Sequence, residues 1–177
     1  MSNRGYTCLI CIRQIKDLRN NQIVPFECGD VKLIALFSFF LHRAPTIESA
    51  TAMVIDSERL QNNWTAFVND TQIQYSEFIA SNCNIKNYIE KNQLQDDADV
   101  NRRTKCFVCK TKTKDEAECN CFLRHIRNSI AHSNVYLLHA GNRKYIMFED
   151  FNTTGNQSAL ILLSQSDLER LKKYIVR

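Results

Sequence analysis

The sequence predicts a mainly α fold in a single domain that spans residues 1–177. Apolar residues recur at helical spacing in several segments, and capping signals precede a number of these segments. The chain has only 4 glycines and 2 prolines, so long flexible linkers are not expected. With 177 residues and 44% hydrophobic residues, it is long and apolar enough to bury one core.

The first third of the chain is expected to be helical after an ambiguous start. Residues 6–18 form a short helix or a strand, because periodicity does not separate the two. Asp30 can cap a helix over residues 31–42 that is apolar nearly all round, which predicts a buried, central position. Thr46 is expected to cap a helix that runs through Met53.

A second amphipathic segment opens at Ser57, and it either continues the preceding helix through a bend or forms a helix of its own. Its apolar stripe consists of Leu60, Trp64, Phe67 and Val68. Because Trp64 lies on this stripe, we interpret it as a core residue and not as a platform for stacking bases. Thr71 and Gln74 then form a capping box for another helix, along which run Tyr75, Phe78, Ile79, Ile85, Tyr88 and Ile89.

Residues 96–105 form an acidic and then basic linker, and the pattern changes again after His132. Residues 135–139 and 143–151 form a predicted hairpin around a Gly-Asn turn, and residues 158–163 form another strand. These strands predict a small antiparallel sheet inserted before the last helix. That helix is expected to begin at the capping box Ser166-Asp167-Leu168-Glu169 and to run through Tyr174.

The segment from Thr113 to His132 carries the candidate chemistry. Thr113 and Glu116 form a capping box, so a helix is expected to start there. Its apolar stripe is Cys119, Phe122, Leu123, Ile126 and Ile130. The polar face opposite this stripe contains Arg124 and Asn128, flanked by Arg127 on one side and by His125 and His132 on the other.

An arginine, an amide and a histidine on one rigid face fit phosphate chemistry. Arginine keeps its charge and presents a fork of donors that matches phosphate oxygens. Histidine titrates near neutrality and transfers protons in either direction. The plainer interpretation is that these residues form a solvated helix face, which is common for basic residues.

The run Arg127-Asn128-Ser129-Ile130-Ala131-His132 resembles the Arg-polar-x-x-x-His motif of the HEPN superfamily (higher eukaryotes and prokaryotes nucleotide-binding domains). The resemblance implies a HEPN-like helical bundle that dimerises and forms a composite site from two motif helices. Many such proteins are metal-independent endoribonucleases that act as toxins or antiviral-defence effectors, whereas others only bind nucleotide, RNA or a protein. By this match Arg127 and His132 are the catalytic residues, and Asn128 is the polar second position.

For an endoribonuclease the expected partner is RNA, and the resemblance implies neither a metal nor another cofactor. The RNA-binding residues would be Arg124, His125, Lys110, Lys112 and Lys114. The three lysines belong to a basic run that leads into the motif helix, although such a run is usually only a solvated loop. Family members are often paired with an antitoxin, in some cases a nucleotidyltransferase-like protein. The alternative function is a non-catalytic binding module.

The eight cysteines leave a zinc module open as a further hypothesis. Cys106-x-x-Cys109 followed by Cys119-x-Cys121 has thiolate spacing, and Cys8-x-x-Cys11 adds a second pair. On a regular helix, however, Cys119 and Cys121 point about 160° apart, so we favour free structural thiols. The N-terminus lacks a signal peptide and no apolar run is long enough to span a bilayer, which predicts a cytoplasmic protein without a membrane segment. The net charge of +4 is compatible with an anionic partner.

Overall fold

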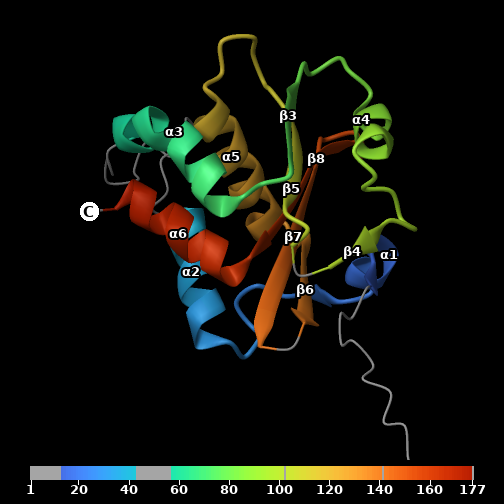
Figure 1. The fold of residues 1–177 in the computed structure, drawn as a ribbon, viewed down its shortest axis with the longest axis vertical. Coiled ribbons are helices and arrows are strands. Elements are labelled where there is room, and N and C mark those ends of the chain that lie inside the picture. The colour runs from blue at the N-terminus through green and yellow to red at the C-terminus, as the bar shows by residue number, and fades with distance from the viewer. Residues whose placement is uncertain (1–12, 43–56, 102, 141, 177) are drawn as a thin grey trace, which may run out of the picture.

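The computed structural model describes residues 13–42, 57–101, 103–140 and 142–176, which form an α/β fold around a mixed sheet (Figure 1). Six strands make up this sheet, in the order β2-β6-β7-β8-β5-β3. Neighbouring strands are antiparallel except β3 and β5, which are parallel. Their bounds are β2 Gln22–Ile23, β3 Tyr75–Ile79, β5 Cys106–Lys110, β6 Val135–Ala140, β7 Arg143–Phe151 and β8 Gln157–Ser164.

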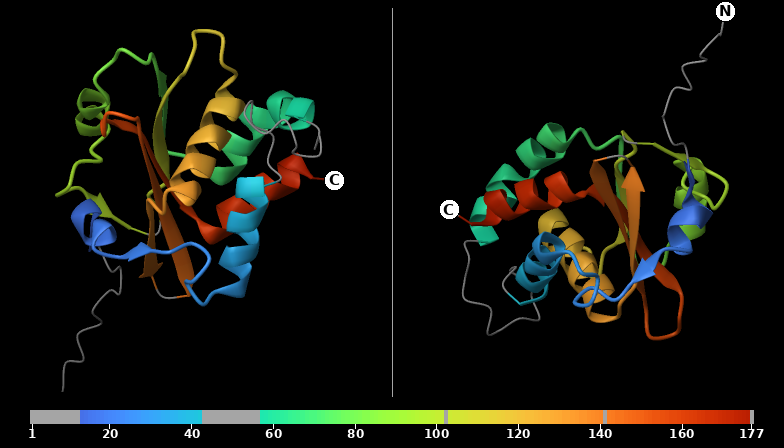
Figure 2. Two further views of the ribbon diagram at one scale, coloured as in Figure 1. Left: turned by 180° about the vertical axis from the view of Figure 1, so that it is seen from behind. Right: turned by 90° about the horizontal axis from the view of Figure 1, so that it is seen from below.

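Helices cover both faces of the sheet (Figures 1 and 2). Helices α2 (Val31–His42), α3 (Ser57–Thr71), α5 (Glu118–Ala131) and α6 (Gln165–Ile175) lie together on one face. The other face carries α1 (Ile15–Arg19), α4 (Ile85–Lys91) and a small two-stranded sheet of β1 (Arg13–Gln14) and β4 (Asp99–Val100). Each face has its own cluster of buried apolar side chains, so the central strands are buried on both sides.

The mainly α fold class, a helical bundle with a small inserted sheet, is therefore wrong. The main cause is β5, whose four buried residues lie within the predicted basic run between Lys105 and Lys114, where the sequence predicts no strand. A strand buried on both faces has no alternation of apolar and polar residues by which to recognise it. The second cause is β3, where the spacing of Tyr75, Phe78 and Ile79 also fits a helix, since so short a run does not distinguish the two.

Other predicted elements are confirmed. Helix α2 has the predicted bounds, and the carboxylate of Asp30 accepts hydrogen bonds from the N–H groups of Lys32 and Leu33 at 3.1 and 3.2 Å. Trp64 is a buried residue of α3, as expected for the core. The three predicted C-terminal strands are β6, β7 and β8, but they form the centre of the large sheet and not a small insertion.

Several helix boundaries differ from the prediction. Thr71 ends α3, and the next residue has a φ of 55°, so no helix begins at that capping box. The C-terminal helix is capped by Ser164, two residues before the predicted cap, because Ser164 and Asp167 form the capping box. The first segment contains both a strand, β1, and a helix, α1. The predicted helix from Thr46 to Met53 and the Cys8/Cys11 pair lie outside the described residues.

Candidate active site

Helix α5 carries the motif and packs its apolar stripe into the core as predicted. Cys119, Phe122, Leu123, Ile126 and Ile130 are all buried. The helix begins at Glu118, however, and its cap residue Ala117 offers no side-chain hydrogen bond, so the expected capping box at Thr113 is wrong. Residues 111–117 form a loop between β5 and α5 instead.

Glu116, the predicted capping residue, forms a buried ion pair with Arg124. Nε of Arg124 lies 2.7 Å from one carboxylate oxygen of Glu116, and Nη2 lies 2.9 Å from the other. Nη2 also donates to the carbonyl oxygen of Lys110 at 3.0 Å, and the backbone N–H of Lys112 donates to Glu116 at 2.6 Å. Arg124 therefore fastens the loop to the helix, and only 13% of its side chain is exposed.

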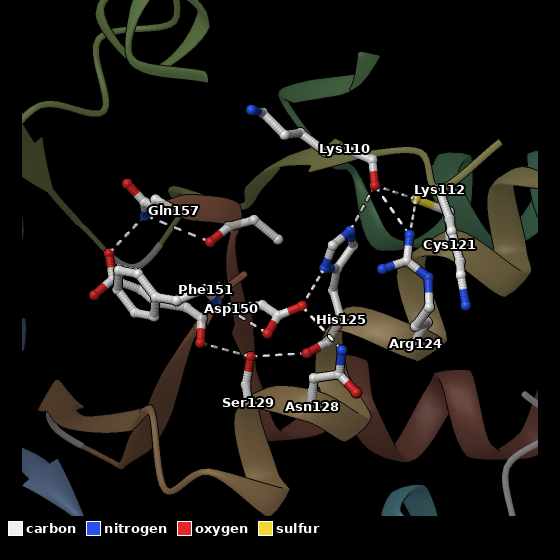
Figure 3. A network of polar contacts seen from close by, with 12 residues as sticks. Lys110, Lys112, Cys121, Arg124, His125, Asn128, Ser129, Asp150, Phe151 and Gln157 are labelled. Atoms are coloured by element: carbon white, nitrogen blue, oxygen red, sulfur yellow. Dashed lines mark hydrogen bonds and ion pairs between the residues drawn. The ribbon is translucent and has the colours of Figure 1, made fainter. Parts of the chain in front are cut away.

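His125 is also enclosed, and it connects α5 to two strands of the sheet (Figure 3). Its Nδ1 lies 2.7 Å from Oδ2 of Asp150 on β7, and its Nε2 lies 2.8 Å from the carbonyl oxygen of Lys110 on β5. The two contacts fix the orientation of the ring between the helix and the sheet. His125 is 0% exposed, so a bound RNA would not reach it in this arrangement, contrary to the expected exposed polar face.

Asp150 joins this network to the motif. Its Oδ2 also accepts a hydrogen bond from Nδ2 of Asn128 at 3.1 Å. His125 and Asn128, the two partners of Asp150, thus lie within one turn of α5. Ser129 adds a link to the same strand, since its hydroxyl donates to the carbonyl oxygen of Glu149 at 2.9 Å. Asn128 is thus held in place from the sheet, through a residue that the motif does not include.

The three motif residues lie in the last turns of α5. Arg127 and Asn128 are half-buried, whereas His132 is exposed. His132 is the C-cap residue: its backbone N–H donates to the carbonyl oxygen of Asn128 at 2.9 Å. The following residue, Ser133, has a φ of 56°, so the chain turns sharply away and leaves the imidazole at the surface.

Residues 43–177 match the family described as HEPN pEK499 p136. The chain belongs to this HEPN family. The predicted membership in the HEPN superfamily is therefore confirmed, and the matched region contains α5 and the motif. The comparisons with curated proteins and with solved structures gave no match.

The basic run of this HEPN protein is divided by the fold. Lys112 and Lys114 are exposed on the loop before α5, whereas Lys110 ends the buried strand β5 and is half-buried. The carbonyl oxygen of Lys110 accepts from His125, Arg124 and Cys121, while its side chain points away from the network (Figure 3). Lys112 and Lys114 are therefore the two exposed members of the run.

The four cysteines of the predicted zinc cluster, all within the described residues, do not form a metal site. Cys106 and Cys109 belong to the core clusters on opposite faces of the sheet. Burial raises the pKa of Cys106 and of Cys121 to about 12, which keeps both thiols protonated. Within the described ranges, no group of three or more His, Cys, Asp and Glu side chains could hold a metal ion. Likewise, none of the helices within these ranges is long and apolar enough to cross a membrane.

Sequence reasoning missed Asp150 and misassigned Glu116. The acidic pair Glu149-Asp150 follows four apolar residues of β7, and both of its members are buried. Two consecutive carboxylates beside a buried apolar run are a signal that buried donors or cations oppose them. That signal could have led to Asp150 and its partner His125.

We expect acid to weaken the fold through Glu116 and Asp150. Burial by itself would raise the pKa of each carboxyl, but hydrogen bonds and charge from Arg124, and from His125 and Asn128, lower both pKa values overall. The stability that such a group contributes is complete above its unfolded pKa and disappears as the pH falls through its lower folded pKa.

Urea unfolding of wild type and Glu116→Gln between pH 7 and pH 3 measures this effect. The advantage of wild type should be largest near pH 7 and should shrink in acid, as the pH falls through the lowered pKa of Glu116. The exposed Glu90→Gln is the matched control and should follow wild type throughout. An advantage that does not change with pH would contradict the assignment.

Proposed function

We propose that this HEPN protein is a metal-independent endoribonuclease with a composite active site in a homodimer. The observation that supports this most is the placement of the motif. Arg127, Asn128 and His132 share the last turns of α5, His132 is exposed, and Asn128 is held by Asp150. A surface histidine beside a fixed polar group is accessible to a macromolecular substrate.

In the proposed reaction His132 takes the proton of a ribose 2′-hydroxyl, and the 2′-oxygen attacks the adjacent phosphorus. The bond from phosphorus to the 5′-oxygen of the next nucleotide breaks, and that oxygen receives a proton from a second histidine. The products are a 2′,3′-cyclic phosphate and a 5′-hydroxyl. Arg127 stabilises the additional negative charge of the phosphorane-like transition state. Asn128 orients His132 from the same face of α5.

A second copy of the chain supplies the second histidine in this proposal. On a helix of about 3.6 residues per turn, positions five apart such as 127 and 132 are about 140° apart. One copy therefore does not aim both side chains at one phosphate easily, whereas two helices related by a two-fold axis place an arginine opposite a histidine.

RNA is expected to reach this site past Lys112 and Lys114, which are exposed on the neighbouring loop. Arg124 and His125 are better described as positioning residues, because their donors are bound to Glu116, Asp150 and Lys110. Single-stranded RNA is the favoured substrate, since attack by the 2′-oxygen needs a flexible backbone. We further propose that the protein is a cytoplasmic toxin or antiviral-defence effector. An antitoxin or a nucleotidyltransferase-like partner would restrain it.

The chemistry of the products tests the proposal. Purified protein with excess EDTA should cut a single-stranded RNA and leave 2′,3′-cyclic phosphate ends, which mass spectrometry identifies. The same oligonucleotide with 2′-deoxy sugars is the matched substrate and should stay intact, because it lacks the attacking oxygen. Absence of cutting, or cutting of the deoxy substrate, would favour the non-catalytic binding module or another reaction.

A further inference from the structure

Two adjoining cavities form a groove between α2 and α6. One has a volume of about 350 Å³ and lies where β7 begins and α6 starts, and the other has a volume of about 450 Å³ and continues along the two helices. Both are lined by Lys32 of α2 and Glu169 of α6, so they form one continuous depression. The two helices lie side by side in Figure 1 and contact each other.

Basic side chains dominate the lining of this α2/α6 groove. They come from three elements of the fold and are Lys32, Arg143, Lys144, Lys172 and Lys173. The lining contains a single acidic residue, Glu169, whose carboxylate accepts a hydrogen bond from Gln165 at 3.0 Å. The excess of positive charge is thus concentrated here, although the whole chain has a net charge of only +4.

Among the described residues, carboxylates neutralise few of these cations. Lys144 is paired with Asp30. Within the part of the chain that the structure describes, Lys32, Arg143 and Lys173 form no ion pair. Lys172 lies over the ring of Phe39, 5.0 Å from its centre. A row of unpaired cations along a depression fits an extended anion better than a single ion.

The apolar side chains that line the groove favour one class of partner. Ala35, Leu36 and Val176 add apolar side chains to the lining of the larger cavity. A single-stranded nucleic acid combines a charged backbone with flat bases, and a positively charged groove can follow such a backbone. The apolar side chains offer a contact surface to the bases. An acidic protein segment would form ion pairs with the cations but would not need apolar side chains in the groove.

We propose that the α2/α6 groove is a second RNA-binding surface, which holds a single strand through its phosphates at a distance from the motif. The inference rests on the proposed function, because it extends the RNA substrate beyond α5. Helix α2 contacts both α6 and α5, so the groove and the motif belong to the same helical layer. A strand that leaves the motif can therefore continue across this layer.

The test is a triple variant, Lys32→Gln, Arg143→Gln and Lys173→Gln, which removes three exposed cations and leaves the Lys144–Asp30 pair intact. Binding of a labelled 2′-O-methyl RNA, which cannot be cleaved through its 2′-oxygen, is followed by fluorescence anisotropy at several salt concentrations. Each phosphate contact contributes about 0.7 to the salt slope of a single strand, so the slope should fall by about 2. Affinity near 0.1 M salt should fall roughly 10- to 100-fold.

The matched control is Lys16→Gln, Lys86→Gln and Arg103→Gln, which removes the same charge from exposed positions in α1, in α4 and in the segment after β4. Its affinity for the RNA should stay within about threefold of wild type, since salt screens the attraction between phosphates and cations that do not touch them. Equal losses in both variants, unchanged affinity in the groove variant, or absence of RNA binding by wild type would each overturn the proposal.

Cleavage separates this proposal from the proposed function. If the groove assignment alone is wrong, the groove variant binds and cuts RNA like wild type. If the nuclease assignment alone is wrong, wild type cuts nothing, yet its binding still depends on the groove cations.

Discussion

Replacing His132 by alanine should lower the rate of RNA cleavage by about 10²- to 10⁴-fold, the range that a general acid or base usually contributes. In the proposed dimer the substitution removes both the base and the acid, so the upper part of this range is expected. His132 is exposed and contributes only backbone to the end of α5, so the fold should stay intact. The measurement is the initial rate of cutting of a labelled RNA in EDTA.

His139→Ala is the matched control, because His139 is also an exposed histidine, on β6. It should retain the activity of wild type, and both variants should unfold within about 0.5 kcal/mol of wild type. If His132→Ala cuts RNA at the rate of wild type, the catalytic role assigned to this residue is wrong.

Replacing Asp150 by alanine should destabilise the protein by about 3–5 kcal/mol, because two buried hydrogen bonds to a charged carboxylate are lost together. The substitution leaves Nδ1 of the buried His125 ring without its partner and releases the amide of Asn128. It also removes the acceptor of the backbone N–H of Phe151. Urea unfolding monitored by circular dichroism measures the loss.

The exposed Asp99→Ala is the control and should cost less than about 0.5 kcal/mol. A double variant with His125→Ala should cost clearly less than the two single losses combined, because the two side chains share one interaction. Additive losses, or a cost below about 1 kcal/mol for Asp150→Ala, would show that the pair is not coupled.

The sequence predicted some segments of this fold better than others, and the difference lies in how each segment is buried. Helix α2 and strands β6, β7 and β8 were identified because capping residues, alternation or a turn mark them locally. Strand β5 lacks such a mark, since the residues that bury it come from α4, α5 and β8, elsewhere in the chain. Its position could be known only from the packing of the whole domain.

The candidate site was predicted to a similar extent. The apolar stripe of α5 and its burial follow from spacing along the helix, which predicts them well. The inward orientation of His125 does not, because it depends on Asp150 and on the Lys110 carbonyl, 25 and 15 residues away. Helical spacing places a side chain on a flank of the helix but does not say what lies opposite that flank.

The order in which the chain is synthesised has a consequence for α2. Its buried residues are covered by elements that follow much later, including α5 and α6, and β2 pairs with residues 135 and 136. Ribosomes add about 5–20 residues per second, so roughly 5–20 s pass between the emergence of α2 and that of β7. During this interval α5 and α6, which cover α2 in the folded domain, have not been made, so the docking of the N-terminal part of the chain is expected among the last steps of folding.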